Sequence, residues 1–275
     1  MANYNIESIE YPSVTTVLKL LDKSGALIPW ALNQCEEKFN YLISNHNTFL
    51  GLEIEGSICK EDVEQYFKEA KYAHRETSQE ALSVGSEVHG ISEIHIKNKI
   101  ANTKIELTIE QMWNTYVQKL EPHLRPATIR DQVMQGYFAF LDWEKEYIKT
   151  WIDSEKTVHS LAYGYAGTLD AKALFLDGKV RYIDFKTSKK IYDESFMQLA
   201  AYRLADYEMT KDWSDGMGIL RLDKETGIPE WIECTDKYER SIDSFLALLK
   251  FYYLQKNRRL KNNPFVKHIK DLYGN

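Results

Sequence analysis

The chain has 275 residues, of which 44% are hydrophobic and 28% are charged, and it contains only 13 glycines and 6 prolines. This composition supplies enough apolar material for a sizeable core, and it excludes collagen-like, low-complexity and intrinsically disordered chains. The formal net charge is −6, which argues against a protein that coats nucleic acid by bulk electrostatics.

The sequence indicates a cytoplasmic protein with no membrane interaction. It contains no apolar run of the ~18 residues that a membrane span needs, and its first residues, MANYNIESIE, lack the basic and apolar regions of a secretory signal. The three cysteines, Cys35, Cys59 and Cys234, are too few to build an iron–sulfur cluster or a four-cysteine metal site within one chain. Any metal ion is therefore expected to have oxygen and nitrogen ligands.

Charge is distributed unevenly along the chain. Residues 1–90 contain 7 basic and 14 acidic side chains, whereas residues 251–275 contain 6 basic side chains and one aspartate. The basic stretch 255–270 has two interpretations at this point, a contact with a phosphate backbone or the solvated end of a helix.

Residues 13 to about 150 are expected to be mainly helical. Apolar residues recur there at helical spacing, as in residues 127–147. Turns are predicted at Ser24-Gly25 and between Pro122 and Pro126, because glycine and proline favour breaks in a helix.

The pattern changes near residue 151 to short runs rich in β-branched and aromatic residues. Strands are predicted over residues 151–160, 165–176, 179–186, 216–223 and 230–234, and helices over 194–208 and 238–260. The first three strands are expected to form an antiparallel meander in an α/β (α+β) core. We expect a single domain over 1–275, in which 1–150 is a large helical portion and 151–275 is the α/β core.

The third predicted strand carries two charged residues on one face. Side chains alternate along a strand, so Asp184 and Lys186 point the same way, roughly 6 to 7 Å apart, while Ile183 and Phe185 point into the core. A carboxylate and an ammonium group are thus presented together.

The hairpin around Asp177-Gly178 decides whether Asp170 joins them. A two-residue turn makes paired residue numbers sum to 355 and places Asp170 on the wrong face. A three-residue loop over 176–178 or 177–179 gives 354 or 356 and restores the shared face. We predict one of the two three-residue loops, and therefore an even sum with Asp170 on the same face as Asp184.

Facing carboxylates repel each other unless a cation lies between them. Hard oxygen ligands favour Mg²⁺ or Mn²⁺ over zinc. Such an ion can activate a water molecule and stabilise charge that develops on a phosphoryl oxygen, and a nearby Lys186 could hold or deprotonate that water. The plain alternative is a surface hairpin with an ion pair.

Four short motifs occur in a fixed order along the chain. They are Gly-Ser-x-x-His at 85–89, Gly-x-x-Asp at 167–170, Asp-x-Lys-Thr at 184–187 and Gln-x-x-x-Tyr at 198–202. Together, over about residues 85–205, they resemble the RecB-like branch of the PD-(D/E)XK nucleases, which includes the mitochondrial genome maintenance exonuclease and many phage exonucleases. The resemblance implies a restriction-endonuclease-like core, with a central mixed sheet flanked by helices.

The resemblance also implies roles for individual residues. Lys186 matches the catalytic lysine, and Gln198 and Tyr202 match a helix that supports it and approaches the cleaved strand. Glu93 and Glu155 have no firm place in the motifs and are left as supporting carboxylates. The metal ligands implied are His89, Asp170, Asp184 and the carbonyl of Phe185.

The expected activity is that of a Mg²⁺- or Mn²⁺-dependent DNA exonuclease acting on ends or single strands in recombination, repair or phage DNA metabolism. An iron–sulfur cluster is not expected, because it needs four cysteines and the chain has three. A nucleotide cofactor is not expected either, because the sequence contains no GxxxxGK(S/T) phosphate-binding loop. DNA is the expected partner, with a recombination or replication protein as a further one. Two alternatives stay open, a ring-forming exonuclease specific for double strands and a non-catalytic descendant that binds nucleic acid or a partner. The expected phosphate contacts are Lys189, Lys190, Arg258 and Arg259.

Overall fold

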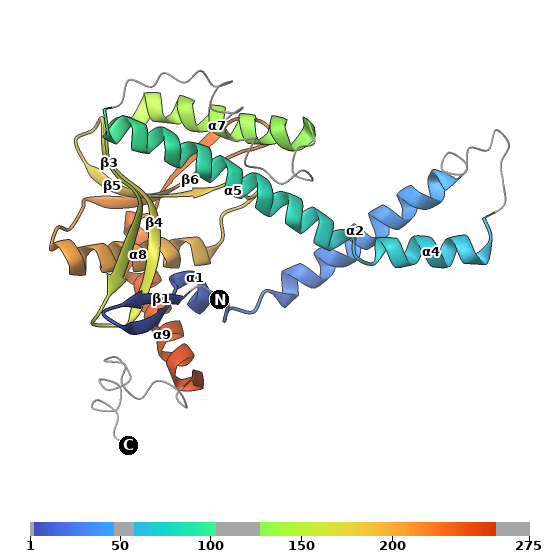
Figure 1. Cartoon of the computed structure of the whole chain (residues 1–275), viewed down its shortest axis with the longest axis horizontal. Coiled ribbons are helices and arrows are strands. Elements are labelled where there is room, and N and C mark those ends of the chain that lie inside the picture. The colour runs from blue at the N-terminus through green and yellow to red at the C-terminus, as the bar shows by residue number, and fades with distance from the viewer. Residues whose placement is uncertain (1–2, 47–57, 103–126, 257–275) are drawn as a thin grey trace. The chain divides into compact units, whose positions relative to one another are not determined.

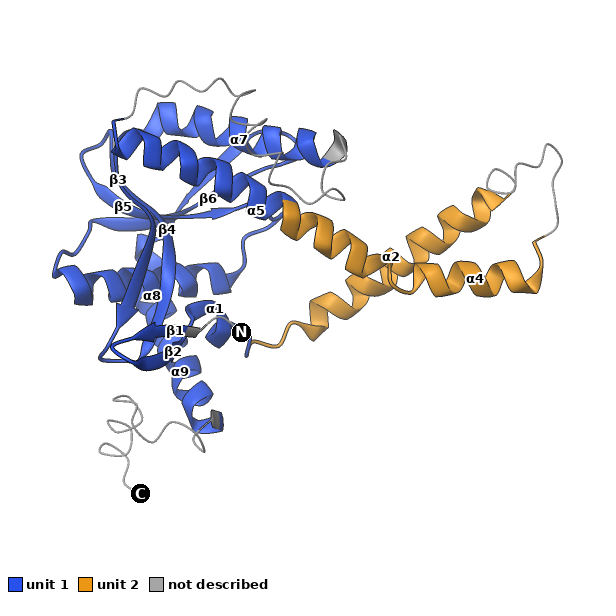
Figure 2. Ribbon diagram, viewed as in Figure 1, with its two compact units in different colours: residues 1–20, 84–275 blue, residues 21–83 orange. Residues whose placement is uncertain are grey.

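The computed structural model describes residues 3–46, 58–102 and 127–256. The chain divides into two compact units, one made of residues 1–20 and 84–275 and the other of residues 21–83 (Figure 2). These boundaries differ from the expected division near residue 150 between a helical portion and an α/β core. The expectation of one domain over the whole chain stays a prediction. Arg258, Arg259 and the rest of the basic tail after residue 256 lie outside the described residues, as do residues 122–126.

The larger unit is built on a five-stranded mixed sheet (Figure 1). The strands are β3 (Ile148–Ser160), β4 (Tyr165–Phe175), β5 (Val180–Lys186), β6 (Gly216–Leu222) and β7 (Pro229–Glu233), and they neighbour one another in that order. β3, β4 and β5 form an antiparallel meander, β6 runs parallel to β5, and β7 is antiparallel to β6. The predicted strands, meander and mixed α/β class are confirmed.

Helices cover both faces of this sheet (Figure 1). The C-terminal part of α5 (Ala73–Ile100) and α7 (Ala127–Tyr147) pack on one face, where their apolar side chains share a core with Ile183 and Phe185. The two helices approach closely because Gly136 has no side chain, and a Cβ there would lie 2.8 Å from Val88.

The opposite face carries α8 (Asp193–Thr210), which packs against the sheet and connects the parallel strands β5 and β6. Parallel strands need such a crossover, and a helix is its usual form. α9 (Tyr238–Lys256) packs against α8. Both helices were predicted; α9 is helical up to residue 256, the last described residue, and the expected end at 260 lies outside the described residues.

A short hairpin that the sequence did not predict precedes the first helix. It consists of β1 (Asn3–Ile6) and β2 (Ile9–Pro12), and its turn residues Glu7 and Ser8 both have positive φ. The hydroxyl of Tyr4 forms a hydrogen bond of 2.8 Å with that of Thr168 in β4. The helical expectation from residue 13 is confirmed by α1 (Val14–Leu18), whose first turn is capped by the side chain of Ser13.

The smaller unit is helical and contains α2 (Ser24–Ser44), α4 (Lys60–Ala70) and the start of α5. α2 contacts α4 through the rings of Phe39 and Phe67, and His46, just after α2, forms a hydrogen bond of 2.9 Å with Tyr66 of α4. The turn predicted at Ser24-Gly25 is wrong, because both residues lie in the first turn of α2. The carboxylate of Asp22 accepts a hydrogen bond from the Ser24 amide there, and a helix start tolerates glycine better than its interior does.

Across the described residues, no helix combines the length and apolar character that would let it cross a membrane.

Candidate metal centre

The β4–β5 hairpin has the register that the sequence predicted. Ala171 pairs with Ile183 and Leu174 with Val180, so paired residue numbers sum to 354. Gly178 has a φ of 83°, and its amide donates to the Phe175 carbonyl at 3.0 Å, as expected for a three-residue loop with glycine in the left-handed region. This register places Asp170 directly across from Asp184, one position beyond the last regular pair.

A third carboxylate occupies the neighbouring strand. Ser154 pairs with Ala171 and Lys156 with Leu169, so Glu155 takes the register position opposite Asp170. Glu155 has a φ of 49°, which is uncommon for a residue other than glycine and breaks the regular alternation of β3. Backbone outliers of this kind concentrate at functional sites. Glu155, Asp170 and Asp184 therefore form one row across β3, β4 and β5.

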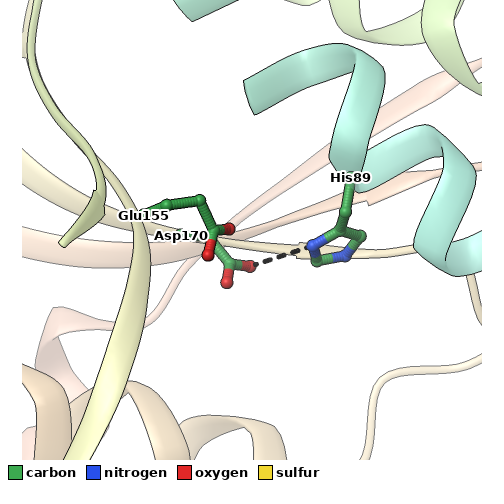
Figure 3. Close-up of side chains that lie close together, drawn as sticks. All are labelled: His89, Glu155 and Asp170. Atoms are coloured by element: carbon green, nitrogen blue, oxygen red, sulfur yellow. Dashed lines mark ion pairs between the residues drawn. The ribbon is translucent and has the colours of Figure 1, made fainter. Parts of the chain in front are cut away.

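α5 brings His89 to this row (Figure 3). Its Nε2 lies 2.9 Å from the carbonyl oxygen of Phe185, and since a carbonyl can only accept, Nε2 is the protonated nitrogen. Nδ1 lies 3.6 Å from Asp170 Oδ2, the oxygen that also accepts from the Phe185 amide at 2.8 Å. In the neutral imidazole, Nδ1 keeps its lone pair and faces the carboxylates, as a metal ligand requires.

Three potential ligand atoms, one each from His89, Glu155 and Asp170, lie within 4.8 Å of one another, and all three residues are partly buried. Burial raises the pKa of Glu155 to about 7, and the Asp170 and Glu93 carboxylates add to this effect against the opposing influence of Lys97. The group thus combines one nitrogen ligand with two crowded carboxylates.

Asp184 lies outside this group of ligand atoms and is engaged by other partners. Its side chain is fully buried, and its Oδ2 lies 2.6 Å from Lys186 Nζ. Gln198 on α8 donates to Asp184 Oδ1 at 3.1 Å and to the Tyr202 hydroxyl at 3.2 Å. The expected pair on one face of β5 is confirmed, whereas a metal contact for Asp184 stays a prediction.

Electrostatics keep Lys186 charged in this setting. Burial acts to lower the pKa of Lys186, but the carboxylates of Asp184 and Asp170 outweigh it and raise that pKa. Burial raises the pKa of Asp184, with Asp170 contributing and the ammonium of Lys186 opposing. The arrangement is a buried ion pair whose ammonium is fixed beside the carboxylate row.

Two glycines explain how the motifs fit together. A Cβ at Gly167, the first residue of Gly-x-x-Asp, would lie 2.3 Å from Cε1 of Tyr202. A Cβ at Gly85, the first residue of Gly-Ser-x-x-His, would lie 3.0 Å from the hydroxyl oxygen of Thr187. Each glycine therefore allows close approach of a side chain from another motif.

The remaining expected residues lie outside the carboxylate row. The carbonyl of Phe185 holds the imidazole of His89 by accepting its hydrogen bond. Lys189 and Lys190 are exposed, and Lys189 forms an ion pair of 3.0 Å with Glu225. Glu93 forms an ion pair with Lys97 on the surface of α5.

Sequence reasoning left Glu155 as a supporting carboxylate, although a signal for its place exists. The predicted strands 151–160 and 165–176 are separated by four residues. If residue 160 pairs with 165, as it does in the structure, Glu155 falls opposite Asp170. The loop-length argument used for the second hairpin also applies to the first.

Comparison with known protein families finds no family model that matches this chain, and comparison with curated proteins finds no significant match. The relation to RecB-like nucleases therefore stays a prediction based on the motifs.

Proposed function

We propose that this protein is a divalent-metal-dependent nuclease that hydrolyses phosphodiester bonds of DNA at ends or in single strands. The observation that carries the proposal is the meeting of His89, Glu155 and Asp170 from three separate elements, with Lys186 held beside the same row of carboxylates by Asp184. On this proposal the mixed sheet and its helices are a restriction-endonuclease-like core.

The ligand atoms fit a hard divalent cation. Two carboxylates and one imidazole nitrogen suit Mg²⁺ or Mn²⁺, and the cation would relieve the repulsion between Glu155 and Asp170. When bound, such an ion supplies charge stabilisation at a phosphoryl oxygen and lowers the pKa of water. The atoms that would hold it are one carboxylate oxygen each of Glu155 and Asp170 and Nδ1 of His89.

The surrounding side chains have separate tasks in this proposal. Lys186, fixed by Asp184, presents a positive charge to a phosphate oxygen and stabilises the negative charge that develops during attack. Gln198 holds Asp184 and the Tyr202 hydroxyl in place. The hydrogen bond from His89 to the Phe185 carbonyl keeps Nδ1 directed at the carboxylates.

A time course with end-labelled single-stranded and double-stranded DNA tests the proposal. With Mg²⁺ or Mn²⁺, we expect the wild-type protein to digest at least one of these substrates. The Asp170→Asn variant should lose about 10²- to 10³-fold in rate, the usual cost of removing one preorganised electrostatic group. Asp243→Asn is the matched control, because Asp243 is exposed on α9.

Equal digestion by the wild type and Asp170→Asn would assign the activity to a contaminant or another site. Binding of DNA without any digestion would instead favour the non-catalytic alternative. Hairpin substrates combined with a sizing column separate the ring-forming exonuclease from an enzyme for single strands.

A further inference from the structure

A basic hollow of about 400 Å³ lies at the C-terminal ends of α5 and α7 and the start of β3. Its wall includes Lys99 from α5, Lys145 from α7, and Lys149 from β3. Ile148, Thr150 and Trp151 contribute the adjacent surface of β3. Three elements therefore each direct one lysine to the same depression.

The positive charge of this hollow is poorly neutralised. Lys99, Lys145 and Lys149 are all exposed, and none of them forms an ion pair with a carboxylate among the described residues. Among the described residues, the wall has one carboxylate, that of Glu144, which is engaged by the ring nitrogen of His95 at 2.9 Å and by the indole of Trp151 at 2.5 Å. Lys99 also acts on Glu144 electrostatically, so this one carboxylate offsets at most part of the charge of three lysines. The hollow therefore favours an anion.

Two of the three elements that line the hollow, α5 and β3, also carry residues of the candidate metal centre. Lys99 follows His89 by ten residues on α5, a rise of about 15 Å at ~1.5 Å per residue. Thr150 precedes Glu155 by five residues on β3, about 16 Å at ~3.3 Å per residue. Both elements thus place the hollow about 15 Å from the carboxylate row.

We infer that this hollow binds a backbone phosphate of the nucleic-acid strand whose cleaved bond lies at the His89, Glu155 and Asp170 centre. The inference rests on the proposed nuclease function and extends it by a second contact. At ~3.4 Å per nucleotide along a duplex strand, about 15 Å corresponds to roughly four nucleotides. The contact engages phosphate and therefore reads no sequence.

Lysines near helix ends have another role that the test must separate. α5 and α7 both end beside the hollow, and cations near a helix C-terminus interact favourably with its partial negative charge. A role of that kind affects the melting temperature. It does not affect how nucleic-acid binding varies with salt.

The experiment compares the wild type with the triple variant Lys99→Gln, Lys145→Gln, Lys149→Gln. Fluorescence anisotropy in EDTA measures binding of a labelled 20-nucleotide single strand over a salt series. Losing the contact with this one phosphate should reduce the slope of log affinity against log salt by about 0.7. In Mg²⁺, the KM for this strand should rise at least about 10-fold, while kcat and cleavage of a trinucleotide stay unchanged.

The control triple variant, Lys19→Gln, Lys68→Gln, Lys179→Gln, removes the same charge from exposed positions outside the hollow and should bind like the wild type. A Lys99/Lys145/Lys149 variant that keeps the wild-type salt slope, with or without a lower melting temperature, overturns the inference and leaves the nuclease proposal standing. A wild type that neither binds nor digests DNA overturns the proposed function, and this inference with it.

Discussion

Two clusters of charged side chains cross the same three strands, and they differ in their balance of charge. In the first, Asp206 of α8 is fully buried and receives three donors: Lys156 of β3 at 2.8 Å, Lys172 of β4 at 3.1 Å and the Tyr182 hydroxyl of β5 at 2.7 Å. Burial acts to raise the pKa of Asp206, but these three hydrogen bonds outweigh it and lower that pKa.

The second cluster lies one or two residues away on each strand and has an excess of negative charge. Of Glu155, Asp170 and Asp184, only Asp184 forms an ion pair with a lysine within the described residues, at 2.6 Å from Lys186, and Lys97 influences Glu155 without such a pair. The pKa of Glu155 is raised to about 7 by burial and by Asp170, whereas the pKa of Asp206 is lowered.

The difference separates a structural cluster from a candidate binding centre. The Asp206 cluster holds its own counter-charges and needs no further ion. Glu155 and Asp170 form no ion pair with a lysine or arginine among the described residues, so a divalent cation bound between them would relieve their mutual repulsion. The predictions below test this contrast.

The largest effect on stability is expected at Asp206. The Asp206→Asn substitution leaves the buried Lys172 without its main counter-charge, and breaking a buried pair in this way costs about 3–5 kcal/mol. Urea unfolding followed by circular dichroism measures the change in the free energy of unfolding, with Asp243→Asn as the control. A loss below about 1 kcal/mol would show that the cluster is not structural.

A smaller effect is expected at Gly167, which admits the ring of Tyr202. Gly167→Ala places a methyl group against that ring and should lower the free energy of unfolding by about 1–3 kcal/mol, the usual cost of overpacking. The control is Gly25→Ala, because a Cβ at Gly25 meets no atom within 4 Å. That control should leave stability unchanged or raise it by up to about 1 kcal/mol. Equal effects of both substitutions would contradict the close packing of the two motifs.

The smallest effect is expected at Glu155 in metal-free protein. Glu155→Gln removes one carboxylate from a cluster with an excess of them, so it should leave the free energy of unfolding unchanged or raise it by up to about 1 kcal/mol. Urea unfolding in EDTA gives the measurement. A loss comparable to that of Asp206→Asn would mean that Glu155 has a structural partner and that the two clusters do not differ.

Local chemistry explains what the sequence predicted well. The β4–β5 register depends on a short loop in which Gly178 adopts positive φ, so the residues of the loop determine it. The pairing of Asp184 with Lys186 follows from strand alternation alone. Both features require only neighbouring residues.

Features that depend on distant contacts were not predicted. The short β1–β2 hairpin rests against β4 through the bond from Tyr4 to Thr168, and these residues are 164 positions apart. The position of Glu155 depends on how β3 pairs with β4 and on its unusual φ. The turn expected at Ser24-Gly25 failed because a local preference for glycine in turns was overridden by the start of α2.

The most direct test of the central claim is calorimetric titration of Mn²⁺ into the wild type, Asp170→Asn and Asp243→Asn. If His89, Glu155 and Asp170 hold a divalent cation, the wild type and Asp243→Asn should bind it alike. Asp170→Asn should then bind at least about 10-fold more weakly, because it loses one of only three protein ligands. Binding of Mn²⁺ by Asp170→Asn as tightly as by the wild type would contradict the account.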